Sequence, residues 1–158
     1  MSEPFHQILV AYDGSTEARM ALDRAIDLAH AWSSRLTIVM VYQRPVTWIA
    51  DPMLGAVMGP VISPEPPGEN DRKTLDEILR QAVQMAKERG VSEVQGELLQ
   101  NHPAEAILRF ADIQHADLIV MGSRGQSPTT RLLLGSVSDA VIHHAHVAVL
   151  VIRPPVPR

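Results

Sequence analysis

Four short runs of almost entirely apolar residues, and a weaker fifth, recur along this chain with helix-like segments between them. The runs cover residues 8–12, 36–42, 91–99 (the weaker one), 117–121 and 147–152. A strand that is apolar at nearly every position is buried on both faces, as in a parallel sheet covered by helices on both sides. The sequence therefore predicts an α/β fold: one doubly wound domain over residues 1–158, built on five parallel strands.

The segments between these runs have the apolar spacing of helices: one that begins after Ser15, and residues 71–89, 103–114 and 136–144. Ser15 is the expected N-cap of the first helix, because a serine hydroxyl accepts a hydrogen bond from a first-turn N–H group. Pro103 suits the first position of its helix, and Glu105 is placed for a capping box. Strands and helices thus alternate along the whole chain except at residues 44–70.

Residues 44–70 interrupt this alternation. They are rich in proline and methionine and have no steady period, which predicts a long loop without regular elements. Three roles stay open for this loop: a lid over a binding site, a protein-contact surface of the adaptable kind that methionine suits, or a tolerated insertion. Residues 153–158 form a proline-rich tail that cannot continue the last strand.

Composition and charge exclude several classes of protein. The net charge of −4 and the pI near 5.9, with no run of Lys or Arg, argue against a nucleic-acid partner. No apolar stretch is long enough to span a bilayer, and residues 1–6 lack the features of a signal peptide. The absence of cysteine excludes disulfides and thiolate chemistry. We therefore expect a cytoplasmic protein that does not insert into membranes.

Glycines follow the fourth strand in a pattern that suits anion binding. Gly122 and Gly125 come directly after residues 117–121, and Gly135 opens the last helix. A strand that ends in a glycine turn beside a helix N-terminus presents unpaired N–H groups and the positive end of the helix dipole. Asp13 follows the first strand, and the carboxyl ends of neighbouring strands in such a sheet face one crevice. This pattern predicts a phosphate site in that crevice.

Two common nucleotide-binding motifs are missing from the chain. The pattern G-x-G-x-x-G does not follow the first strand, and G-x-x-x-x-G-K-[ST] does not occur. Their absence argues against the dinucleotide-binding Rossmann enzymes and the P-loop NTPases, so a different phosphate site is expected.

The chain resembles the universal stress protein family along almost its whole length. The resemblance rests on Val10-Ala11-Tyr12-Asp13-Gly14-Ser15, on the spacing Gly122-x2-Gly125-x9-Gly135-Ser136, and on the closing residues 132–138 and 149–152. The full glycine pattern resembles the branch that binds ATP. It implies a stress-response protein that binds ATP, with Mg²⁺ accompanying the triphosphate, on a sheet of strand order 3-2-1-4-5. It also implies a homodimer whose last strands, from Val147 to Ile152, pair edge to edge.

The same resemblance implies a role for each site residue. Asp13 would hydrogen-bond the ribose, and Ala11 and Tyr12 would line the edge of the nucleotide. Val41 would meet the adenine, largely through its backbone. Two segments would lie around the phosphates. They comprise Met121, Gly122, Arg124 and Gly125 in the first, and Gly135, Ser136 and Val137 in the second. The glycines would admit the phosphates, and residues 135–137 would offer N–H groups and a hydroxyl. No residue is implied as a catalyst or as a metal ligand.

Simpler interpretations stand beside these roles. An Asp-Gly pair makes a good turn, in which Asp13 only accepts backbone hydrogen bonds. Ser136 is followed three residues later by an aspartate, which fits an N-cap. An arginine in a polar loop, such as Arg124 or Arg131, is more often solvated than bound to phosphate, and we prefer this interpretation for Arg131.

Histidines at two places need an interpretation of their own. His143, His144 and His146 are close in sequence, but no acidic or cysteine partner is near, so no zinc site is expected. Asn101 and His102 stand where many relatives in the resembled family have glycine and then Asp or Asn. The bulkier His102 would narrow the crevice or contact the base.

Two alternative functions remain open. A weak ATPase or a nucleotidyl or phosphoryl transferase needs a group that activates the nucleophile at the γ-phosphate, and the glycine-rich segment offers hydroxyls and Arg124 but no base. An adaptor would act through residues 44–70, with little or no nucleotide binding. The missing base favours a protein that acts by binding ATP rather than by turning it over.

Overall fold

The computed structural model describes residues 5–43, 46–47, 52–59, 61–62, 68–124 and 134–155. Its core is a five-stranded parallel sheet made of β1 (Gln7–Ala11), β2 (Arg35–Tyr42), β5 (Val94–Gln100), β6 (Leu118–Gly122) and β7 (Ala148–Ile152). The strands lie in the order β5-β2-β1-β6-β7, which confirms the predicted order 3-2-1-4-5. The central strand β1 pairs with β2 on one side and β6 on the other, so Val10 lies opposite both Ile38 and Val120.

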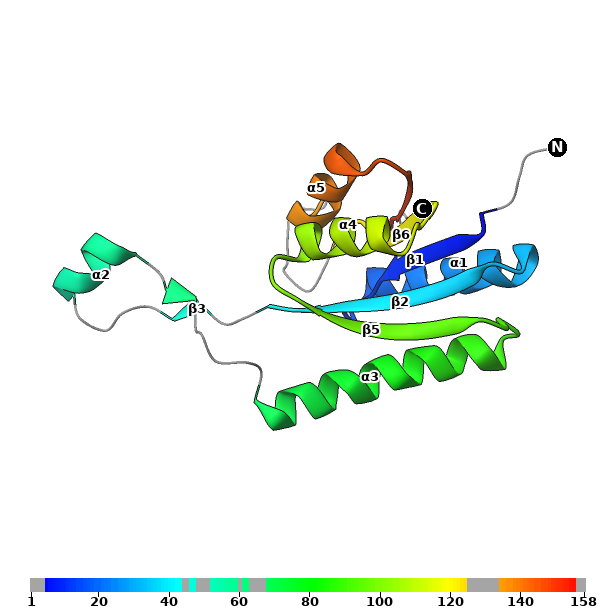
Figure 1. Ribbon diagram of the computed structural model, residues 1–158, viewed down its shortest axis with the longest axis horizontal. Coiled ribbons are helices and arrows are strands. Elements are labelled where there is room, and N and C mark those ends of the chain that lie inside the picture. Colours follow the sequence, from blue (N-terminus) through cyan, green and yellow to red (C-terminus); the bar gives the residue numbers. More distant parts are fainter. Residues whose placement is uncertain are drawn as a thin grey trace.

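Two layers of helices cover the sheet (Figure 1). The helices are α1 (Thr16–Trp32), α3 (Glu69–Glu88), α4 (Pro103–Ile113) and α5 (Ser136–His144). The first two pack on one face of the sheet and the last two on the other. Successive residues of a strand point to opposite faces, so Val10 joins the core under α1 and α3, while Leu9 joins the core under α4 and α5. The central strands are apolar at most positions because both of their faces are covered.

The residues that cap the helix N-termini agree only in part with those predicted from the sequence. Ser15 caps α1 as predicted, and its hydroxyl oxygen accepts the N–H of Ala18 at 3.2 Å. His102 caps α4 without a side-chain hydrogen bond, so the expected capping box lacks its first partner. Gly135, in extended conformation, caps α5. The interpretation of Ser136 as that cap is therefore wrong, since Ser136 is already the first helical residue.

The prediction of a loop without regular elements at residues 44–70 is wrong for part of that range. It contains the short helix α2 (Pro52–Met58) and the strands β3 (Val46–Thr47) and β4 (Val61–Ile62), which pair antiparallel. Elements of two and seven residues are too short to leave a readable period, which is why the sequence did not indicate them. Figure 1 shows α2 well apart from the layered core. Much of the intervening chain lies outside the described residues.

The strand β7 forms one edge of the sheet. It pairs in parallel with β6 over its full length, from Ala148 opposite Leu118 to Ile152 opposite Gly122. No helix in the described part of the chain is both long and apolar enough to cross a membrane.

Candidate functional site

A cavity of about 460 Å³ lies at the carboxyl ends of β1, β2 and β6. The strand order reverses between β1 and β6, because the chain first builds outward to β2 and β5 and then crosses to the other side. Doubly wound sheets bind their ligands at this switch point. The cavity volume is within the usual range of small-molecule pockets, about 300–1,000 Å³. We call this cavity the cleft.

Most of the residues singled out from the sequence line the cleft. Those that do are Ala11, Tyr12, Asp13, Val41, Met121, Gly122, Arg124, Gly135, Ser136 and Val137. Gly125 and Arg131 lie outside the described residues. The positions come from three strand ends and one helix start that are far apart in sequence, and the doubly wound topology brings them together.

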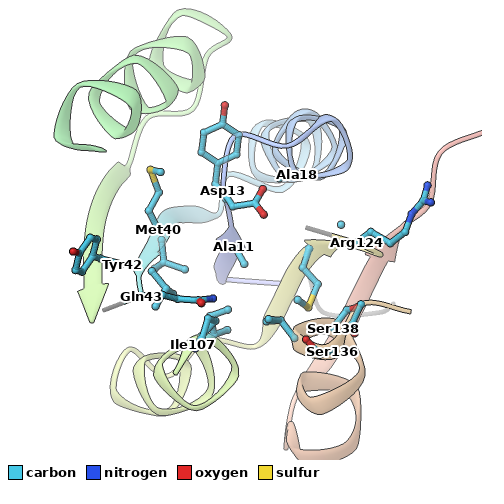
Figure 2. A pocket seen from close by; sticks show the side chains of 18 of the residues that line it. Ala11, Asp13, Ala18, Met40, Tyr42, Gln43, Ile107, Arg124, Ser136 and Ser138 are labelled. Carbon is cyan, nitrogen blue, oxygen red and sulfur yellow. The ribbon is translucent and has the colours of Figure 1, made fainter. Parts of the chain in front are cut away.

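The carboxylate of Asp13 both stabilises a turn and forms part of the cleft wall. Its Oδ1 accepts the N–H of Ser15 at 2.9 Å, which fixes the turn between β1 and α1. The side chain also lines the cleft, and Figure 2 shows its carboxylate directed into the space between the surrounding lining residues. The turn interpretation and the binding interpretation of Asp13 are therefore compatible.

Gly122 is a glycine for a reason that the sequence does not indicate. A Cβ at this position would lie 2.8 Å from Glu17 Cβ, 2.9 Å from the Glu17 carbonyl carbon and 3.1 Å from the Ala18 nitrogen. The missing side chain thus lets the first turn of α1 approach the end of β6. Close packing of α1 on β6 accounts for this glycine before any contact with a phosphate is considered.

The start of α5 is fastened to the end of β6 by hydrogen bonds. The N–H of Gly135 donates to the Ser123 carbonyl at 2.7 Å. The buried hydroxyl of Ser138 lies within donating distance of two carbonyls, at 2.9 Å from Ser123 and 3.0 Å from Gly135. N–H groups in the first turn of a helix have no partner within the helix. Because Ser136 and Val137 line the cleft, the positive end of the α5 dipole is held at its wall.

Arg124 is not the solvated arginine that a polar loop favours. Its Nη2 lies 2.8 Å from Oε1 of Glu17, and the two side chains are only 22% and 15% exposed. Glu17 is 107 residues away from Arg124 along the chain. No local pattern signals such a pair.

The other end of the cleft is mostly apolar. Here Val41 is joined by residues that were not expected at the site from the sequence: Met40, Tyr42, Gln43, Leu75, Pro103 and Ile107. Pro103 and Ile107 belong to the first turns of α4. In a parallel sheet the helix that follows a strand begins at the strand's carboxyl end, so these two residues could have been expected at the cleft. Leu75 comes from α3 and had no such signal.

His102 is exposed and does not line the cleft, so it does not narrow it. Asn101 has φ +95°, a conformation that asparagine tolerates better than most residues.

His143 of α5 contacts a residue of its own helix. Nδ1 of His143 lies 2.8 Å from the Asp139 carbonyl oxygen and 3.5 Å from Oδ1 of Asp139, one helical turn earlier. In the described part of the chain no three His, Cys, Asp or Glu side chains come together as a metal site would require.

Fold and cleft together place this chain among the doubly wound α/β proteins with a pocket at the switch in strand order. The model of the universal stress protein family matches residues 4–153, and the chain belongs to this family. The resemblance seen in the sequence is thereby confirmed. A relative from Thermus aquaticus, the universal stress protein in QAH/OAS sulfhydrylase 3'region, is 34% identical over 149 residues, which cover 94% of this chain and 99% of the relative.

Two solved structures extend the comparison. A universal stress protein in complex with cAMP is 27% identical and has a TM-score of 0.68, with 95% of this chain and 98% of that chain covered. The universal stress protein from Archaeoglobus fulgidus in complex with dAMP is 26% identical and has a TM-score of 0.64, with coverages of 94% and 98%. Both of these similar proteins hold an adenine nucleotide.

Proposed function

We propose that this protein binds an adenine nucleotide in the cleft, with ATP as the expected ligand, and acts in the stress response by binding rather than by turnover. The observation that carries the proposal is the composition of the cleft from end to end. An apolar wall around Val41 suits a base, the Asp13 carboxylate suits ribose hydroxyls, and the N-terminus of α5 suits phosphates. The nucleotide complexes of the two similar proteins support the same ligand class.

Mg²⁺ would enter with the triphosphate rather than bind to a site of its own. Mg²⁺ in nucleotide sites usually keeps several waters and binds phosphate oxygens with one or two carboxylates. Among the described residues that line the cleft, Asp13 is the only carboxylate. We therefore expect the metal to change the affinity for ATP but not for AMP.

Titration calorimetry of the nucleotide-free protein with ATP and Mg²⁺ tests the proposal. We expect submicromolar to micromolar binding with one nucleotide per chain. A protein with a correct fold that binds neither ATP, ADP, AMP nor cAMP would falsify the proposal.

A pair of variants at Ser136 tests the role of the α5 N-terminus. Ser136→Pro removes one N–H group at the first helical position, where proline is well tolerated. Gly135 already has φ −63° and ψ 155°, the extended conformation that a following proline requires. The variant is expected to fold normally and to bind ATP about tenfold or more weakly, the effect of losing one charge-assisted hydrogen bond. Ser136→Ala keeps the N–H and serves as the matched control. Equal affinity of the two variants would show that this N–H does not meet a phosphate.

We also propose that the protein is a homodimer that pairs through β7. The strand is an edge of the sheet, and the side chains of residues 149–152 are only partly buried. An apolar edge strand left open invites pairing with another chain. Light scattering on the purified full chain should give twice the mass of one chain, and a monomer at micromolar concentration would contradict this proposal.

A second candidate function, that of an adaptor, is favoured by one observation. None of the residues of α2 is buried, and Met53 and Val57 have exposed fractions of 83% and 82%. An apolar helix surface of this kind suits contact with another protein. Replacement of residues 46–62 by a short Gly/Ser linker distinguishes the roles. Loss of nucleotide affinity would indicate a lid, and unchanged affinity with loss of a partner in pull-down would indicate an adaptor.

A further inference from the structure

The positive charge at the phosphate end of the cleft is already neutralised by a carboxylate of the protein. Among the described residues that line the cleft, Arg124 is the only one with a positive charge. Its guanidinium is paired with the carboxylate of Glu17 at 2.8 Å. This ion pair is the least exposed of those in the described part of the chain, with side-chain exposures of 22% and 15%. Figure 2 shows the Arg124 side chain extended away from the other lining residues.

Glu17 is held firmly in its place. It belongs to the first turn of α1, which Ser15 caps through the N–H of Ala18. Its backbone packs directly against Gly122, with no room for a side chain between the two elements. The backbone of Glu17 is thus fixed, and its side chain, only 15% exposed, lies where its carboxylate neutralises Arg124. Partly buried pairs are also less screened by salt than pairs in open solvent.

We propose that Glu17 sets the preference of the cleft for the number of phosphates in its ligand. Glu17 neutralises Arg124 and directs its guanidinium toward α1, so in the native cleft Arg124 adds little affinity for each additional phosphate. Nucleotide recognition then rests on groups other than the Arg124 guanidinium: the apolar wall, the Asp13 carboxylate and the N-terminus of α5. This inference rests on the proposed nucleotide binding and adds which groups of the protein recognise the nucleotide.

Neutralising Glu17 would release Arg124 toward the ligand. In Glu17→Gln the side chain keeps its size and loses its charge, so the guanidinium becomes available to the β- and γ-phosphates. A hydrogen bond between charged groups is worth about tenfold or more in affinity. We therefore expect Glu17→Gln to raise the ratio of ATP affinity to AMP affinity about tenfold. The gain should shrink as salt is raised from low to physiological concentration.

The experiment is calorimetric titration of the full-length protein with AMP, ADP and ATP, in EDTA to exclude metal effects. Three forms are compared: the native protein, Glu17→Gln, and the double variant Glu17→Gln with Arg124→Gln. The double variant carries neither charge and should return the ATP:AMP ratio to within about threefold of the native value, a margin set well below the effect of one charge-assisted bond. Thermal melting of each form checks that it is folded.

The outcomes separate this inference from the proposed function. An unchanged ATP:AMP ratio in a folded Glu17→Gln variant overturns the inference and leaves nucleotide binding intact. If Glu17→Gln does not fold, the double variant still decides. A large fall of its ATP:AMP ratio below the native value would show that Arg124 already serves the phosphates, contrary to the inference. If the native protein binds no nucleotide, it is the proposed function that fails.

Discussion

The substitution Gly122→Ala should damage this protein even when no nucleotide is present. The new methyl group would lie 2.8–3.1 Å from two backbone atoms and one Cβ of α1. These distances are roughly 0.3–0.6 Å shorter than an ordinary contact of 3.4 Å, so α1 and β6 must move apart. Backbone atoms cannot escape by changing a rotamer, and overpacking of this kind costs about 1–3 kcal/mol. For a domain of this size that corresponds to a fall of roughly 2–12 °C in Tm.

The same movement should weaken nucleotide binding. The turn that carries Asp13 leads directly into α1, and Ala18 of α1 lines the cleft. A shift of α1 by a few tenths of an ångström therefore changes both walls of the cleft near the ribose and phosphates. We expect a lower Tm without ligand together with a lower affinity for ATP, measured by scanning calorimetry and by titration.

Gly135→Ala is the matched control for this substitution. A Cβ at Gly135 would lie 3.3 Å from the Arg124 Cα and from the Ser123 carbonyl oxygen, only slightly inside an ordinary contact of 3.4 Å, and the Gly135 φ of −63° suits any residue. The expected cost is about 1 kcal/mol at most, the effect of alanine at an N-cap. The reasoning is refuted if Gly122→Ala melts within 1 °C of the native protein, or if Gly135→Ala is the more damaging of the two.

Three further substitutions test single hydrogen bonds. Asp13→Asn keeps an oxygen that can accept the Ser15 N–H, so the Tm should change little. The affinity for ATP should fall about tenfold, because a charged acceptor at the ribose is lost. An affinity equal to that of the native protein would show that Asp13 serves only the turn. Ser138→Ala removes the hydroxyl that fastens α5 to β6, and urea denaturation should report a loss of about 1 kcal/mol. Ser15→Ala removes the α1 cap and should cost about 1 kcal/mol by the same measurement; no loss would show that water replaces the hydroxyl.

The sequence predicts those parts of the structure that depend on neighbouring residues. Apolar runs such as residues 117–121 indicate buried strands because burial on both faces leaves no polar position. Ser15 indicates a helix start because its partner is only three residues away. The resemblance to universal stress proteins supplied the strand order, which local patterns alone did not fix. The elements within residues 44–70 were missed because each is too short to have a period.

The sequence also indicated those parts of the candidate site that follow directly from the order of strands and helices. The strand ends and the start of α5 line one cleft, because parallel strands bring their carboxyl ends to one side of a sheet. Leu75 was missed because its place in the cleft depends on how α3 lies against the sheet. The expectation that His102 narrows the cleft was wrong, because His102 is exposed and does not line it.

The sequence by itself thus determined the α/β class, the family and most of the residues around the cleft. Only the tertiary structure decided why Gly122 is a glycine and what Arg124 does. Both answers involve Glu17, which lies on another element more than a hundred residues away. Hydrogen bonding and burial along one element leave a periodic trace in the sequence. A contact between two distant elements leaves none, because it depends on how the crossovers pack them against the sheet.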